Sequence, residues 1–159
     1  MSVTITDRDN GWRAMLERAH ELAKKGPLVK VGILDDAPKD VAPGSSPSAY
    51  TLVEVAAVHE FGSEHVPQRS FLRATIDSKG AELKRLLNVV ATNAFQGKTT
   101  LKQGLGQVGA KAAAWVQRAI AQGVPPPLAE STIARKGSSK PLIDTGQLRS
   151  AITHRVEGP

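Results

Sequence analysis

Two short phrases that combine glycine, proline and large apolar side chains set the turns of this 159-residue chain. The first runs from Val58 to Gly62 and resumes from Pro67 to Leu72, and the second runs from Pro141 to Leu148. Each phrase also carries a helix-capping residue, and this combination fixes the angle at which one element meets the next. The two phrases therefore predict a shape, and neither has the composition of a reaction centre.

Length and composition predict one domain with a modest core. Domains cluster near roughly 100 to 150 residues, so residues 1–159 are expected to form a single unit. Only 4% of the residues are aromatic, so Leu, Val, Ile and Ala must fill most of the core. The expected aromatic anchors are Trp12, Phe61, Phe71, Phe95 and Trp115. The chain has no cysteine, which excludes disulfides and thiolate chemistry. It also shows no signal peptide or membrane-spanning run, so we expect a soluble chain.

The order of the periodic segments predicts an α+β fold. Helices are expected over 11–25, from Thr51 to Phe61, from Ser70 to about Gln96 and over 100–122, with strands over 28–34 and 151–156. The two strands are expected to pair as a small antiparallel sheet packed against the two long helices. Long Pro-rich loops complete the fold: 35–50 is a flexible loop or arm, and 123–143 is an extended link with an optional short helix over 128–136.

Capping residues mark the expected helix starts. Asp9 or Asn10 suits the first helix, Thr51 with Glu54 forms a capping box, and Thr99 or Thr100 suits the helix over 100–122. Asp144 is expected to cap the last helical turns, with Gln147 as the third helical residue. Gly104, Gly106 and Gly109 disfavour helix, so close helix packing or local unwinding is expected there.

The positive charge of the chain is concentrated on one segment. The net charge is +6, and no Asp or Glu occurs between Leu83 and Ala129. That segment contains the basic residues Lys84, Arg85, Lys98, Lys102, Lys111 and Arg118. One interpretation is a helical surface that faces phosphates or an acidic partner, and the other is a pair of solvated helix faces.

The sequence contains short patterns that look like catalytic or cofactor-binding motifs, but the neighbouring residues do not have the structure that these motifs require. Residues 104–109 match the glycine pattern of dinucleotide-binding proteins, but a helix cap precedes them where a strand is required. Gly97, Lys98 and Thr99 lack the earlier glycine of a phosphate-binding loop. A metal site formed by His59, Glu64 and His65 is one interpretation, and a packing role for His59 is the other. We expect no enzyme, no cofactor and no catalytic or metal site, and no motif for sequence-specific nucleic-acid binding.

Taken in this order, the two phrases resemble those of the tail-completion, or head-tail joining, proteins of tailed bacteriophages, a family that includes Mu-like virion-morphogenesis proteins. The resemblance covers nearly the whole chain. By position, His59, Glu60, Phe61, Gly62, Pro67, Arg69, Phe71 and Leu72 match the first phrase, and Leu142, Ile143, Asp144, Thr145, Gly146 and Leu148 match the second. Ser70 departs from the proline often found in the first phrase, and its hydroxyl is able to preserve the helix start by capping.

The resemblance implies a structural subunit of the virion neck, assembled in the host cytoplasm, that joins the tail to the DNA-filled head. The implied partners are further copies of the chain in a ring, expected to be a hexamer, and neighbouring neck, portal-side and tail proteins, with nonspecific proximity to double-stranded DNA and no membrane. The six basic residues are then candidates to line the DNA channel, and 35–50 and 123–143 are candidates to reach adjacent subunits. A tail-terminator ring subunit, a nonspecific DNA-binding protein and a hydrolase using His59 or His65 remain alternatives.

Overall fold

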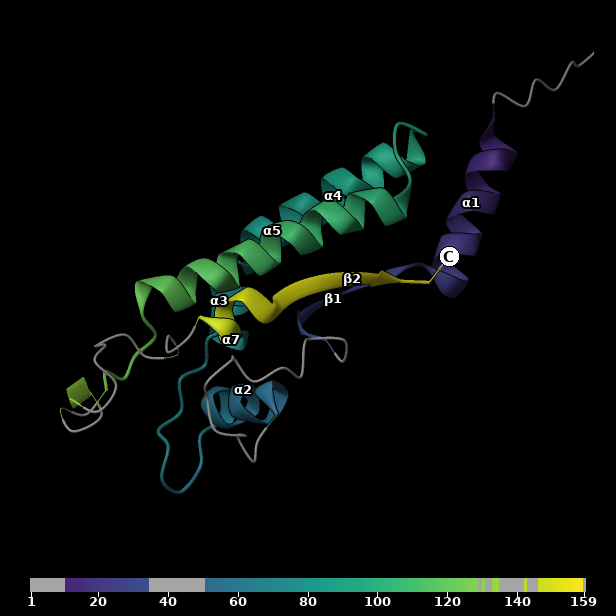
Figure 1. Cartoon of the computed structure of the whole chain (residues 1–159). Coiled ribbons are helices and arrows are strands. Elements are labelled where there is room, and N and C mark those ends of the chain that lie inside the picture. The colour runs from purple at the N-terminus through teal and green to yellow at the C-terminus, as the bar shows by residue number, and fades with distance from the viewer. Residues whose placement is uncertain are drawn as a thin grey trace, which may run out of the picture.

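The fold is described from a computed structural model, which defines residues 11–34, 51–128, 130, 133–134, 142 and 146–158. This part of the chain forms the expected α+β fold, with several helices around a two-stranded sheet. In Figure 1, α4 and α5 lie side by side along one side of the sheet, α2 lies toward its other side, and α1 projects beyond the strand ends. None of the described helices has the length and hydropathy needed to cross a membrane.

The sheet joins the beginning of the chain to its end. Strand β1 (Leu28–Ile33) pairs antiparallel with β2 (Ile152–Glu157), with Val31 opposite His154. The predicted pairing of these segments is therefore confirmed. Side chains of β1 alternate between exposed and half-buried up to Gly32, as expected of a strand with one face on a core.

Helix α5 (Leu101–Gln122) is the central element, and it contacts both strands as well as α4. It begins with a capping box, in which the Thr100 hydroxyl accepts from the Gln103 backbone N–H and the Gln103 side chain accepts from the Thr100 N–H. It ends at Gly123, whose φ of 98° suits glycine. The predicted start and end of this helix are confirmed.

Two glycines let α5 approach its neighbours closely. A Cβ atom at Gly104 would lie 2.5 Å from Val90 of α4 (Gly80–Phe95), and one at Gly109 would lie 2.6 Å from Val29 of β1. A Cβ at Gly106 would meet only ordinary contact, 3.9 Å from Val156. Two alternatives were predicted at these glycines, close packing and local unwinding. Because α5 is continuous over 22 residues, the structure shows close packing.

The single helix expected from Ser70 to about Gln96 is wrong. The structure has α3 (Arg73–Ser78) and α4, with Lys79 between them. The Ser78 hydroxyl donates to the Thr75 carbonyl at 2.7 Å, and such local bonds compete with helix propagation. Gly80 follows, and glycine weakens a helix interior by roughly 1 kcal/mol.

The main core gathers around α5 and the start of β2. Its buried members are Ala56, Phe71, Ala113, Val116, Ile120, Val124, Leu142, Leu148 and Ile152. Phe71 and Trp115 are buried, as predicted of the aromatic anchors. The prediction is wrong for Trp12, Phe61 and Phe95, which are 60%, 68% and 42% exposed. Trp12 belongs to the projecting α1, and Phe61 is the last residue of α2.

The helices near the N-terminus match their predicted ranges. Helix α1 spans Trp12–Lys25 after Gly11, and its proposed caps Asp9 and Asn10 lie outside the described residues. Helix α2 (Leu52–Phe61) starts with the predicted capping box of Thr51 and Glu54. The 35–50 segment lies outside the described residues, as do most of the 128–136 segment and of the 123–143 link beyond Leu128.

Replacing Gly104 by Ala should lower the free energy of unfolding by about 1–3 kcal/mol, because the added methyl overlaps Val90 and overpacks the contact between α4 and α5. Gly106→Ala is the matched control in the same helix, and it should be neutral or stabilising by up to about 1 kcal/mol. Urea denaturation of both variants measures the difference. Equal stability of the two variants would contradict the close packing at Gly104.

Candidate functional site

The first phrase builds a closed turn at the end of α2. Gly62 has a φ of 79°, and its N–H donates to the Val58 carbonyl at 2.8 Å. A Cβ at Gly62 would lie 3.1 Å from the Gln68 backbone nitrogen, so the position requires glycine on two grounds. The Arg69 N–H then donates to the His59 carbonyl at 2.7 Å. The chain leaves α2 and returns to it within one short loop.

Glu60 is the polar centre of this turn. It is only 6% exposed, and its carboxylate accepts from the Ser70 hydroxyl at 2.6 Å, from the Leu72 N–H at 2.9 Å and from the Arg73 N–H at 3.0 Å. Those two N–H groups belong to the start of α3, where a negative charge is favourable. Ser70 also accepts from the Ala74 N–H at 3.2 Å. Glu60 and Ser70 therefore both accept from N–H groups at the start of α3, although the N-cap position itself is Leu72, two residues after the cap predicted at Ser70.

Arg69 links the first phrase to the proline segment that follows α5. Its side chain is buried, with the residue 4% exposed. The guanidinium donates from Nε to the Pro126 carbonyl at 2.8 Å and from Nη2 to the Pro127 carbonyl at 3.1 Å. Planar paired donors suit two neighbouring carbonyls better than a lysine ammonium would. The role of Arg69 was not predicted from the sequence.

The matching residues of the first phrase divide into an inner and an outer set. Glu60, Arg69 and Phe71 are buried, and His59, Gly62 and Leu72 are half-buried. Phe61 and Pro67 are exposed. Because Phe61 is a large apolar side chain that the described residues leave open, it is available for contact with another molecule.

The second phrase delivers two leucines to the same core as Phe71. Leu142 is buried with a φ of 63°, and Leu148 is buried in helix α7 (Gln147–Ala151). Gly146, with a φ of 78°, directly precedes that helix. Gln147 is thus the first helical residue, and the expectation that it would be the third is wrong. Ile143, Asp144 and Thr145 lie outside the described residues, so the predicted cap by Asp144 falls there too.

The six basic residues of the acid-free segment are all exposed. Lys84 and Arg85 lie on α4, Lys98 lies in the turn between the helices, and Lys102, Lys111 and Arg118 lie on α5. Lys102 donates to the Gly158 carbonyl at 3.4 Å. The helical pair therefore presents these cations to solvent within this chain.

One acidic residue just before that segment pairs with one of the six basic residues. Lys111 forms an ion pair of 2.9 Å with Glu82, and its Nζ lies 5.6 Å from the centre of the Trp115 ring. The hydrogen bond from Lys111 holds the pKa of Glu82 below its ordinary value. This contact therefore favours the fold at neutral pH, and its contribution disappears as the pH falls through the lowered pKa.

The residues that suggested a cofactor or metal site in the sequence have structural positions in the described part of the chain. Residues 104–109 lie inside the continuous α5, which differs from the strand-to-helix turn of a dinucleotide site. Across the described residues, no group of three His, Cys, Asp or Glu side chains is close enough to hold a metal ion. Glu60 is occupied by hydrogen bonds within the turn.

Comparison of the chain with family models, with curated proteins and with solved structures found no match.

Replacing Glu60 by Gln should lower the free energy of unfolding by about 1–3 kcal/mol, because an amide keeps only one acceptor oxygen for three partly buried donors. The backbone N–H groups of Leu72 and Arg73 should also exchange faster with solvent. Glu64→Gln, at an exposed position of the same loop, should change stability by less than about 0.5 kcal/mol. Denaturation together with NMR hydrogen exchange measures both effects, and unchanged protection in Glu60→Gln would rule out the capping role.

Proposed function

We propose that this chain is a structural subunit of a tailed-phage neck. In this proposal, copies of the chain form a ring, expected to be a hexamer, that joins the tail to the DNA-filled head and surrounds the passage for DNA. The chain acts by shape and charge and catalyses no reaction. Support comes from the two phrases that resemble the tail-completion family, because their buried members lock α2, α3 and the proline segment into one joint.

The observation that carries the proposal is the exposure of the cationic residues on α4, α5 and their connecting turn. Among the described ion pairs, Lys111 is the one of these six basic residues that pairs with a carboxylate, that of Glu82. Exposed Lys and Arg side chains favour nearby phosphates without reading bases, and that attraction falls as salt increases. A passage for DNA of any sequence requires this kind of surface.

A nonspecific DNA-binding protein is the second candidate, because the same cationic surface would support it. The two candidates differ in assembly. The neck subunit must be found in particles as a closed ring, whereas the alternative requires no ring and acts as separate copies.

Particles assembled by a phage that encodes this chain should contain a ring of it between head and tail, with α4 and α5 facing the central passage. Electron cryomicroscopy of those particles tests the arrangement directly. When the gene is disrupted, heads and tails should accumulate separately, and the wild-type chain or Glu64→Gln supplied in trans should restore joining. A ring whose basic helices face outward to solvent would contradict the passage, and joined particles without the chain would contradict the function.

Replacing Lys84, Arg85 and Arg118 together by Gln should weaken binding to linear double-stranded DNA and make it less dependent on salt. The plot of log binding constant against log salt concentration should become shallower by about 0.9 for each phosphate that these side chains no longer neutralise. Lys30→Gln is the control, because Lys30 is a basic residue of the sheet that pairs with Glu157 at 2.7 Å. Fluorescence anisotropy over a salt series measures the slopes, and an unchanged slope in the triple variant would remove these residues from the DNA surface.

A further inference from the structure

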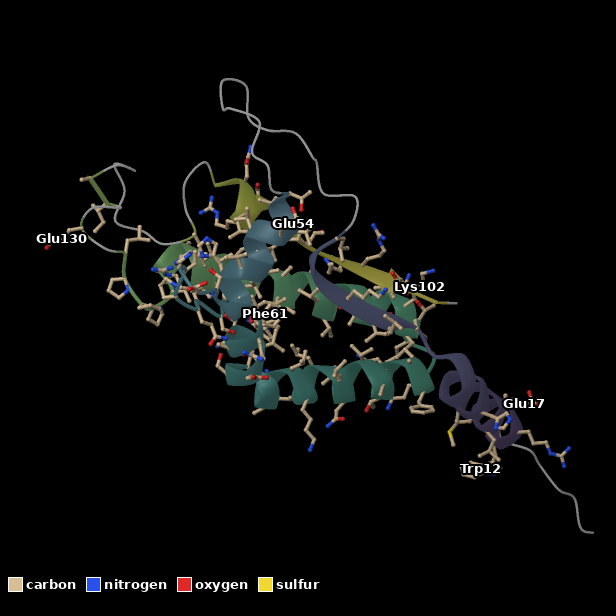
Figure 2. All side chains as sticks on the ribbon, turned by 90° about the horizontal axis from the view of Figure 1, so that it is seen from below. Trp12, Glu17, Glu54, Phe61, Lys102 and Glu130 are labelled. Carbon is tan, nitrogen blue, oxygen red and sulfur yellow. The ribbon has the colours of Figure 1, made fainter. Side chains whose placement is uncertain are left out.

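Helix α1 presents an apolar stripe that the described part of its own chain leaves uncovered. The α1 stripe consists of Trp12, Met15 and Leu16, which are 60%, 36% and 48% exposed. Every residue from Gly11 to Glu17 is exposed, and α1 projects from the body of the molecule (Figures 1 and 2). Isolated helices shorter than about 12–15 residues are marginal in water. A 14-residue amphipathic helix in this position therefore gains stability from a partner surface.

A second uncovered apolar surface lies on α2. The α2 face consists of Val58 and Phe61, which are 36% and 68% exposed and stand three residues apart, so they share one side of the helix. Val53, which is 45% exposed, lies about 140° around the helix from Val58 and is outside this face. Trp12 and Phe61 lie well apart in Figure 2, with Trp12 toward one end of the molecule and Phe61 nearer its middle.

The sequence segments that carry the two surfaces differ in net charge. The sequence of α1 contains four basic and two acidic residues. Residues 51–68, which include α2 and the following loop, contain Glu54, Glu60 and Glu64 and neither Lys nor Arg. Glu54 and Glu64 are exposed. Hydrogen bonds from Thr51, chiefly from its backbone N–H, hold the pKa of Glu54 below its ordinary value, so this carboxylate is charged at neutral pH.

We propose that the α1 stripe of one copy packs on the α2 face of a second copy. The surfaces are both apolar, the sequence segments that carry them are opposite in net charge, and they are different surfaces of one chain. Contact between different surfaces repeats head to tail, and it closes into a ring when the rotation between copies allows. This contact rests on the proposed function, since it supplies the subunit interface of the ring.

Cross-linking tests which surfaces meet. The chain lacks cysteine, so each introduced thiol is unique. Copies with Leu16→Cys are mixed with copies carrying Val58→Cys, and a short thiol-to-thiol cross-linker is added to concentrated protein and to assembled particles. The mixed product should dominate over either product from a single variant. Leu16→Cys mixed with Ser78→Cys, at an exposed position on α3, is the control and should give little mixed product. Absence of the Leu16–Val58 product from both preparations, or dominance of like-with-like products, would overturn the contact.

Substitution tests whether the contact stabilises assembly. Trp12→Asp and Phe61→Asp should each raise the dissociation constant for self-association by about tenfold or more, since large aromatic anchors dominate such interfaces. Val89→Asp is the control, because Val89 is 53% exposed on α4 and lies outside both surfaces. Sedimentation velocity over a concentration series measures assembly, and thermal unfolding confirms that the variants stay folded.

The outcomes separate this contact from the proposed function. Normal rings formed by Trp12→Asp and by Phe61→Asp would overturn the contact and leave the neck ring standing. Failure of the wild-type chain to self-associate in solution and in particles would overturn both.

Discussion

The buried carboxylate of Glu60 is the interaction on which the rest of the arrangement depends. A charge removed from water is costly unless it is fully hydrogen-bonded, and Glu60 satisfies this requirement only while Ser70, Leu72 and Arg73 stay in place. The start of α3 is therefore tied to the end of α2. Because α3 leads through Lys79 directly into α4, the direction of the cationic helical pair follows from this turn.

A second buried charge extends the same joint to the far end of α5. Arg69 donates to two consecutive proline carbonyls, which remain hydrogen-bond acceptors although prolines have no N–H. The core beside this joint receives Phe71 from the first phrase and Leu142 and Leu148 from the second. The two phrases are distant in sequence, yet they meet in one cluster around α5. Both phrases therefore contribute side chains that this one core needs.

Local features are the ones that the sequence predicts best. The capping box at Thr51 and the helix end at Gly123 depend on residues within one turn, and both were predicted correctly. Thr100 was one of the two caps predicted for α5, and its capping box with Gln103 was not predicted. The antiparallel pairing of the first and last strands was also predicted, because both segments alternate and each needs a partner. The glycines of α5 indicated close packing, although only the structure identifies Val90 and Val29 as the neighbours.

Features that depend on distant residues were missed. The break at Lys79 is hidden by apolar periodicity that continues through it, and the contacts of Arg69 require the proline segment to fold back over a long stretch of sequence. The uncovered state of Trp12 was also missed, because an amphipathic helix has the same pattern whether its partner is its own chain or another. For the candidate site, the sequence identified the residues of both phrases and a hydrogen-bonding role for Ser70. It did not distinguish the buried residues Glu60 and Arg69 from the exposed Phe61.

The rigid connections within the subunit bear on how a ring of it would work. Gly104 brings α4 within close contact of α5, and Gly109 does the same for the sheet. Glu60 ties α2 to the start of α3, and Arg69 ties the same turn to the proline segment that follows α5. The α2 face and the cationic helices therefore keep a fixed relation, while α1 has few contacts with the rest of its chain. In a ring built from the proposed contact, α1 would adjust to the neighbour, and the charged wall would keep its geometry because its orientation is set within each copy.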